Sequence, residues 1–131
     1  MALNILVVDD SETVRAIILK TLKMSGIALN APLEASNGSE ALALLKEQWV
    51  DLVLTDINMP EMGGVELIER MKDDEILKAI PVVVVSTEGS ATRIEELKAK
   101  GVKAYIRKPF TPEQIREVVD EVLGVNNDGE S

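Results

Sequence analysis

A chain of 131 residues, 46% of them apolar, is long enough for one domain with a buried core. It has neither cysteine nor histidine, which excludes disulfides, zinc–thiolate sites, thiol nucleophiles and imidazole bases. The net charge of −9 argues against direct nucleic-acid binding, which requires clustered Lys and Arg. No apolar run approaches a membrane span and no secretory signal is evident, so we expect a cytoplasmic protein without membrane insertion.

Strands and helices are predicted to alternate along the whole chain. Apolar runs predict the strands, and apolar residues at helical spacing between capping residues and glycines predict the helices. In chain order the elements are a strand at 3–8, a helix from Ser11 to Gly26, a weak strand at 28–35, a helix from Asn37, a strand at 50–55, a helix from Gly63-Gly64 to 72, a strand at 81–85, a helix at 90–100, a strand at 102–106 and a helix from Thr111 to Gly124. Pro32 restricts the weak strand to a sheet edge.

Two of the helix starts carry a capping-box pattern, in which the N-cap side chain and the side chain three residues later bind each other's backbone N–H groups. These pairs are Asn37 with Glu40 and Thr111 with Gln114. Residues 1–124 are predicted to form the domain, and residues 125–131 are predicted to be a disordered tail.

Five apolar strands, each followed by a helix, predict an α/β fold in which helices cover both faces of a parallel sheet. We expect the flavodoxin-like, doubly wound fold with five helices and strand order 2-1-3-4-5, an order taken from known folds of this class. Right-handed crossovers place the carboxyl ends of all strands at one edge, where such folds bind ligands.

Polar residues follow the strands at that edge. They are Asp9 and Asp10 after the first strand, Asp56 after the third, Ser86 and Thr87 at the fourth, and Lys108 after the fifth. Each alone has an ordinary explanation as a helix cap, a turn residue or a solvated charge. Because the first and third strands are neighbours in this order, the three aspartates are expected to converge.

Converging carboxylates require a compensating cation. Two of them ~5 Å apart repel by about 3 kcal/mol at an effective dielectric of ~20, and Lys108 supplies only one charge. Mg²⁺ suits a site with few carboxylates and several waters, and the backbone carbonyl of Asn58 is a further candidate ligand. In such a setting Asp56 can attack phosphorus and form an aspartyl phosphate. Glycine-rich nucleotide-binding loops are missing, which disfavours a bound nucleotide as the phosphoryl source.

The motifs LVVDDS, EASNGSEAL, DLVLTDINMPEMGG, PVVVVST and AYIRKPF follow one another in this order. Together they resemble the response regulator receiver domains of two-component signalling, in the single-domain CheY-like form, over roughly residues 3 to 123. The resemblance implies that Asp56 is the phosphoacceptor. It also implies that Mg²⁺ is held by Asp9, Asp10, Asp56 and the carbonyl of Asn58.

The resemblance assigns further roles around the site. Ser86 is implied to be the switch hydroxyl, Lys108 to pair with the phosphoryl oxygens, and Tyr105 to be the aromatic side chain that rotates inward on activation. Without the resemblance, Tyr105 reads as a half-buried strand residue with its hydroxyl in water. Asn58 and Glu88 occupy positions that tune the loss of the phosphoryl group, and a cis peptide bond is implied before Pro109.

Three positions depart from the family pattern. Gly63 stands where many members have Asp, which is expected to loosen the start of the third helix. Thr87 is bulkier than usual and narrows access to the phosphoryl site. Pro32 makes the second strand atypical.

The leading hypothesis is a signalling switch rather than an enzyme, although the chain takes part in its own phosphorylation and dephosphorylation. A sensor histidine kinase would phosphorylate Asp56, and the face of the fourth helix, fifth strand and fifth helix would then bind a target protein. Candidate targets are a flagellar motor switch component, a phosphatase or a phosphotransfer protein. The alternatives are a phosphohydrolase, disfavoured because haloacid-dehalogenase-like enzymes have Asp at the position of Asn58, and a degenerate receiver that only docks.

Overall fold

The chain forms one parallel sheet in a computed structural model that describes residues 2–87 and 90–124. Its strands are β1 (Ile5–Val8), β2 (Leu33–Ala35), β3 (Leu52–Thr55), β4 (Val82–Ser86) and β5 (Ala104–Arg107). The strand order is β2-β1-β3-β4-β5, and every neighbouring pair is parallel. The predicted doubly wound α/β fold is therefore confirmed.

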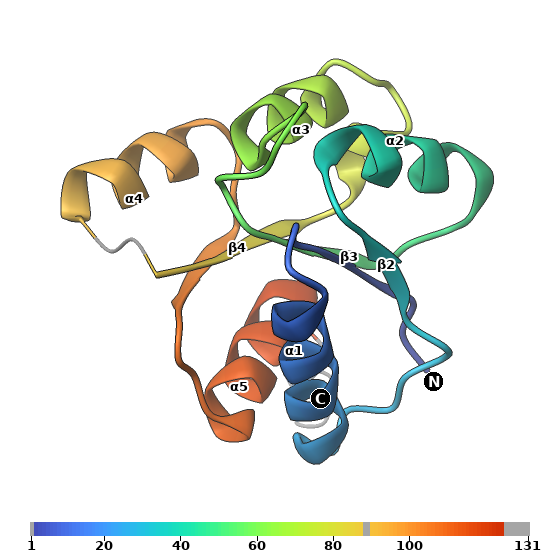
Figure 1. Ribbon diagram of the computed structural model, residues 1–131, viewed down its shortest axis with the longest axis vertical. Helices are drawn as coiled ribbons and strands as arrows, with labels where there is room; N and C mark the ends of the chain where they lie inside the picture. The colour runs from blue at the N-terminus through green and yellow to red at the C-terminus, as the bar shows by residue number, and fades with distance from the viewer. Residues whose placement is uncertain (1, 88–89, 125–131) are drawn as a thin grey trace.

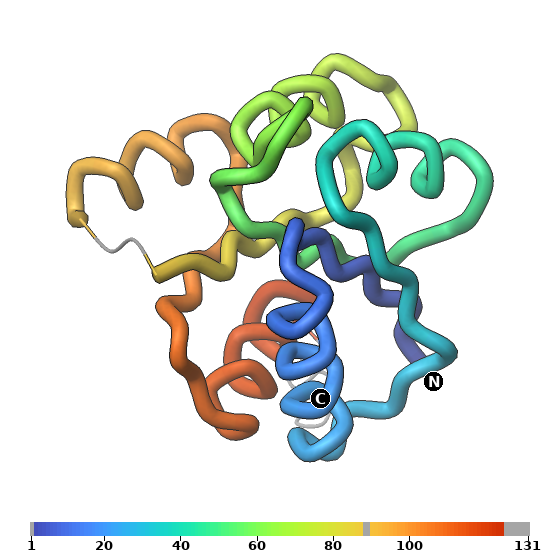
Figure 2. Tube along the Cα trace, viewed as in Figure 1, coloured from blue at the N-terminus to red at the C-terminus, as the bar shows by residue number. Residues whose placement is uncertain are grey.

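Helices cover both faces of this sheet. They are α1 (Glu12–Met24), α2 (Gly38–Glu47), α3 (Gly64–Lys72), α4 (Ala91–Ala99) and α5 (Pro112–Leu123), with a short 3-10 turn η1 (Leu77–Ala79) that was not predicted. Figure 1 shows α1 and α5 on one face and α2, α3 and α4 on the other. The trace in Figure 2 shows the same layers, with the sheet between them.

The two faces of the sheet carry separate apolar cores. Along β1, Ile5 and Val7 pack with α1 and α5, whereas Leu6 and Val8 pack with α2, α3 and α4. All four side chains are buried. Burial on both faces explains why the strands read as continuous apolar runs instead of alternating patterns.

The helix caps mostly follow the sequence prediction. Thr111 and Gln114 form the complete capping box at α5, with hydrogen bonds of 3.1 and 2.9 Å. At α2 only half of the expected box forms, because Asn37 accepts the N–H of Glu40 but the Glu40 carboxylate accepts the N–H of Ser36. This bond to Ser36 is the main cause that lowers the pKa of Glu40 below its usual value.

The second strand is shorter than predicted. Residues 28–32 contribute an isolated bridge between Leu29 and Leu3, and β2 begins only after Pro32, at the edge of the sheet. Proline lacks the N–H that strand pairing needs, so pairing resumes beyond it. The edge position predicted from Pro32 is confirmed.

Candidate functional site

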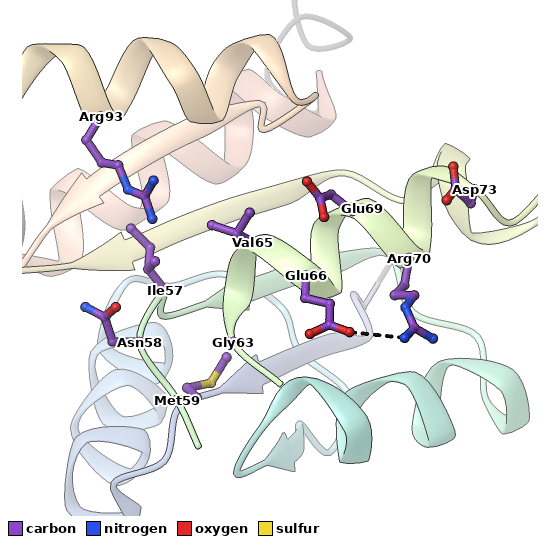
Figure 3. Close-up of a pocket in the computed structure, with 10 residues that line it drawn as sticks. All are labelled: Ile57, Asn58, Met59, Gly63, Val65, Glu66, Glu69, Arg70, Asp73 and Arg93. Carbon is purple, nitrogen blue, oxygen red and sulfur yellow. Dashed lines mark hydrogen bonds and ion pairs between the residues drawn. The ribbon is translucent and has the colours of Figure 1, made fainter. Parts of the chain in front are cut away.

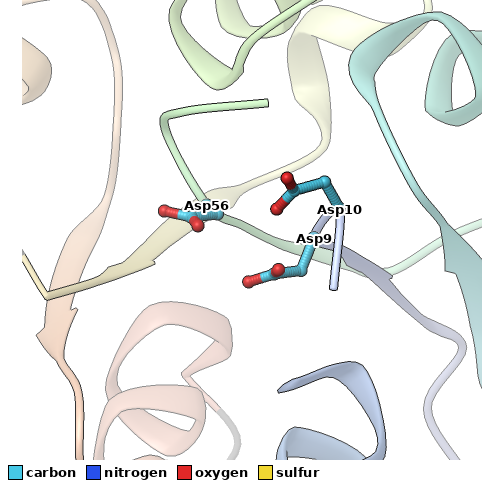
Figure 4. Close-up of side chains that lie close together, drawn as sticks. All are labelled: Asp9, Asp10 and Asp56. Atoms are coloured by element: carbon cyan, nitrogen blue, oxygen red, sulfur yellow. The ribbon is translucent and has the colours of Figure 1, made fainter. Parts of the chain in front are cut away.

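Three aspartates meet at the carboxyl edge of the sheet. β1 and β3 are neighbours in register from Ile5–Leu52 to Val8–Thr55, so the residues that follow these strands lie side by side. Each of Asp9, Asp10 and Asp56 offers a carboxylate oxygen, and these oxygens lie within 4.8 Å of one another. Figure 4 shows the three side chains converging from two chain segments, which confirms the expected convergence.

Asp9 is held firmly although it is almost completely buried, with 2% of its surface exposed. One carboxylate oxygen accepts the Ser11 N–H at 2.9 Å and the other accepts Lys108 Nζ at 3.1 Å. The Arg15 guanidinium donates to the Asp9 carbonyl oxygen at 2.6 Å and to Glu34 at 2.9 Å. Asp10 is exposed, so water reaches this side of the cluster.

Asp56 is largely buried. Its side chain is 16% exposed, and burial is the main cause that raises its pKa above the usual value. The Ile57 N–H, which donates to it at 2.7 Å, and the Lys108 charge oppose this increase, whereas the Asp9 charge adds to it. Asp56 is thus a carboxylate whose negative charge is only partly compensated within the protein.

Gly64 permits the backbone after Asp56 to turn closely. A Cβ atom at Gly64 would collide with the carbonyl oxygen of Asp56, so no larger residue fits there without a shift of the backbone. Gly63 is the N-cap of α3 and has no side chain to form a cap, so the looser helix start expected there stays a prediction.

Lys108 links two of the acids. Its Nζ atom lies 3.1 Å from Asp9 and 3.6 Å from Asp56, and only 17% of its side chain is exposed. The Lys108–Pro109 peptide bond is cis, as the family resemblance implied. The backbone N–H of Lys108 also donates to the Ser86 carbonyl at 2.9 Å, which joins the β5–α5 turn to the end of β4.

The two residues expected to report activation lie on neighbouring strands. Ser86 ends β4 and is buried, with 2% of its surface exposed. Tyr105 packs with the core on the side of α2, α3 and α4. Its hydroxyl is buried and forms no hydrogen bond within the described part of the chain. Tyr105 is thus a half-buried strand residue, as the simpler reading had it, but the expectation that its hydroxyl lies in water is wrong.

A groove of about 680 Å³ opens beside the site, between the β3–α3 loop, α3 and α4. Figure 3 shows Asn58 and the Arg93 side chain from α4 toward the same end of it, with Ile57 between them in this view. Farther along α3, a carboxylate oxygen of Glu69 lies 3.2 Å from Nζ of Lys100, the residue at the end of α4. The exposed side chain of Asn58 places it at the rim, whereas Glu88 lies outside the described residues.

Sequence reasoning missed Arg15 and Arg93 as neighbours of the site. Arg15 had a usable signal, because it lies four residues after the N-cap Ser11 and so one helical turn from the acidic loop. Arg93 had none, since its position depends on how α4 packs against the sheet.

The residues present fit a magnesium ion. All the converging side-chain atoms are carboxylate oxygens, and the exposed Asp10 leaves room for the waters that Mg²⁺ retains. The Lys108 ammonium balances one of the three negative charges, which leaves a deficit that a divalent cation offsets.

The comparisons with known proteins agree with this geometry. The family model described as "Response regulator receiver domain" matches residues 5–120. A chemotaxis protein CheY homolog of Campylobacter jejuni is 40% identical over 126 residues, which is 95% of this chain and 95% of that protein. The chemotaxis protein CheY1 of Helicobacter pylori is 40% identical over 126 residues, covering 95% of this chain and 100% of that protein.

Solved structures extend the match to three dimensions. The chemotaxis protein CheY4 of Vibrio cholerae superimposes with a TM-score of 0.82 at 32% identity, covering 94% of this chain and 100% of that one. A CheY in a CheX-CheY-BeF3-Mg complex from Borrelia burgdorferi gives a TM-score of 0.81 at 27% identity, covering 92% and 88% of the two chains.

The chain belongs to the response regulator receiver domain family and is of the CheY type. Receiver domains are phosphoacceptor regulators rather than classical enzymes, and they act in phosphorylation-dependent signalling. They bind Mg²⁺ at an acidic pocket, and the three aspartates form an acidic cluster here. Within residues 2–87 and 90–124, no helix has the length and apolar character to cross a membrane.

Proposed function

We propose that this protein is a signalling switch that accepts a phosphoryl group on Asp56 from a sensor histidine kinase. The observation that carries the proposal is the position of Asp56. It is a carboxylate of raised pKa, 3.6 Å from the Lys108 ammonium and within reach of the Asp9 and Asp10 oxygens.

In the proposed transfer, a carboxylate oxygen of Asp56 attacks the phosphorus of a phosphohistidine on the kinase. The new O–P bond forms as the N–P bond breaks, and the imidazole leaves. Lys108 lies where it can neutralise the charge of the transferred group, while Asp9 orients its ammonium. Asp9, Asp10, Asp56 and the Asn58 carbonyl would hold Mg²⁺, which when bound would supply further charge neutralisation.

The proposed readout passes through Ser86 and Tyr105 to the face formed by α4, β5 and α5. A phosphoryl dianion beside the end of β4 attracts the Ser86 hydroxyl. Tyr105 is the side chain expected to respond, and its buried hydroxyl without a partner in the described residues supports this role, because a new acceptor would stabilise it. The population of target-binding conformations then rises.

The partners are proposed at the level of class. The phosphodonor is a sensor histidine kinase, and the target is a flagellar motor switch component, a phosphatase or a phosphotransfer protein. The relative from Borrelia burgdorferi, solved in a complex with CheX, supports a protein as the target. We place the protein in the cytoplasm, and we assign Asn58 and Glu88 to the tuning of self-dephosphorylation.

The experiment is intact mass spectrometry after incubation with acetyl phosphate and Mg²⁺. We expect a mass increase of one phosphoryl group that needs Mg²⁺ and disappears in Asp56→Asn. The matched control is Asp73→Asn, an exposed acid outside the cluster, which should retain the increase. Repeated hydrolysis of phosphate esters would instead indicate a phosphohydrolase, and no reaction at all would indicate a docking module.

A further inference from the structure

A second hollow lies at the amino edge of the sheet, opposite the carboxylate cluster. It has a volume of about 540 Å³ and lies between the end of α3, η1, the start of β4 and the turn from α4 to β5. Buried Ile68, Met71 and Leu77 form part of an apolar floor. Gly101 contributes open space, because no atom lies within 4 Å of the position that a Cβ would occupy.

The rim of this hollow is basic although the protein is acidic. Four lysines line it, and no Asp or Glu of the described residues does; the lysines are Lys72, Lys78, Lys100 and Lys103. These four are a substantial share of the 14 basic residues in a chain of net charge −9. Positive charge is therefore concentrated at one concave place on an otherwise negative molecule.

Two of the four lysines have no acidic partner within the described part of the chain, namely Lys72 and Lys103. Lys78 pairs with Glu75, and Lys100 with Glu69, both at 3.2 Å and both at exposed positions. Exposed pairs of this kind contribute little and exchange readily for another carboxylate. All four ammonium groups are thus able to meet an incoming anion.

We propose that this hollow, which we term the lysine pocket, docks an acidic peptide segment of a partner protein that carries an apolar anchor residue. The anchor would fill the floor beside Met71 and Leu77, while its flanking carboxylates would meet the lysines of the rim. Apolar burial supplies affinity, and the charges supply orientation. The surrounding negative surface would repel the same segment elsewhere on the molecule.

The shape and charge of the lysine pocket favour a peptide over an extended anionic surface. A flat membrane or a nucleic acid would bring many negative charges against a chain of net charge −9. A protruding side chain flanked by a few carboxylates contacts only the concave basic region. Because the pocket and the aspartates lie at opposite edges of the sheet, docking does not compete with chemistry at Asp56.

The test is a nuclear magnetic resonance titration of the isotope-labelled protein, without phosphodonor, with a short peptide of glutamates around a central Leu-Phe pair. We expect amide shifts at Leu77, Gly101 and Lys103. Affinity should fall about tenfold in the double variant Lys72→Gln, Lys103→Gln. The matched control, Lys20→Gln with Lys23→Gln on α1, removes the same charge from exposed positions elsewhere and should bind as the unmodified protein does.

Several results would overturn the proposal. One is an equal loss of affinity in both double variants, and another is amide shifts at other surfaces. Full binding of a peptide with serines in place of the Leu-Phe pair, or no peptide binding at all, would have the same consequence. The proposal would also be overturned if the protein bound no peptide but sedimented with phosphatidylserine vesicles. The same holds if it bound no peptide but formed lysine-dependent dimers in ultracentrifugation. The single variant Lys103→Gln repeats the test with a smaller change. We expect the Asp56→Asn variant to bind the peptide and the lysine variants to be phosphorylated normally. These two results separate this inference from the proposed function.

Discussion

Two aspartates flank the same strand, β3, and their surroundings are opposite. Asp51, before the strand, accepts the Asn4 N–H at 2.8 Å and the Trp49 Nε1–H at 2.8 Å. Asp56, after the strand, accepts one backbone N–H and lies among two other acids and one lysine. The first carboxylate ties the amino edge of the sheet together, whereas the second retains uncompensated charge. The comparison shows that burying a carboxylate stabilises a fold only where enough donors surround it.

The largest expected effect comes from removing the Lys108 ammonium group beside Asp56. Lys108→Ala should slow phosphorylation by acetyl phosphate about 100-fold or more, because the transferred group loses the ammonium charge that would neutralise it alongside Mg²⁺. The rate is measured by intact mass against time in saturating Mg²⁺. The control Lys98→Ala removes an exposed lysine of α4 and should leave the rate unchanged. An unaltered rate in the folded Lys108 variant would remove Lys108 from the proposed mechanism.

The next largest effect is expected at Asp51, the carboxylate that accepts two N–H groups. Asp51→Ala should lower the free energy of unfolding by about 1–2 kcal/mol, because the Asn4 N–H and the Trp49 indole N–H lose their acceptor. Urea denaturation measures the loss, and Asp73→Ala is the exposed control. A loss no greater than that of the control would show that water replaces Asp51 without cost.

A smaller effect of opposite sign is expected at Asp56. Its pKa is raised by folding, so the stability held by its protonated form is present below the unfolded pKa of about 3.9 and is lost as pH rises through the folded pKa. Without Mg²⁺, Asp56→Asn should therefore be more stable than the unmodified protein at neutral pH, by up to about 1 kcal/mol.

This gain should disappear as the pH falls below about 4, where both proteins are neutral at this position. Added Mg²⁺ should also reduce or reverse it, since the ion stabilises the protein with the intact carboxylate. Urea denaturation across a pH series, with and without Mg²⁺, measures both trends. A variant less stable than the unmodified protein at pH 7 without Mg²⁺ would contradict the partly compensated charge assigned to Asp56.

The smallest effect is expected at Glu40, a solvent-exposed carboxylate whose pKa folding lowers. Its contribution is present above the unfolded pKa of about 4.3 and is lost as pH falls through the folded pKa. Glu40→Gln should cost a few tenths of a kcal/mol at pH 7, because the bond to the Ser36 N–H loses its charge. Thermal unfolding at pH 7 and pH 3 checks this, and an equal cost at both values would exclude an electrostatic origin.

The sequence predicted most of the framework. Each apolar run became a strand, and the N-caps Ser11 and Thr111 lie where their local patterns indicated. It overestimated β2, because Pro32 was used to place the strand at an edge but residues 28–31 were still expected to pair as part of it, and only the isolated bridge at Leu29 forms there. It also placed the Glu40 bond on the wrong neighbour, since the choice between two adjacent N–H groups depends on the local backbone course.

By itself, then, the sequence determined which residues form strands and helices, and which acids follow strands, because these properties depend on neighbours along the chain. Only the tertiary structure decided that oxygens of three carboxylates lie within 4.8 Å of one another and that Arg15 donates to the Asp9 carbonyl. It also decided that the Tyr105 hydroxyl is buried and that four lysines line one hollow. These features join segments distant in sequence. Their distances follow from how the strands register and the helices pack, which no local pattern encodes.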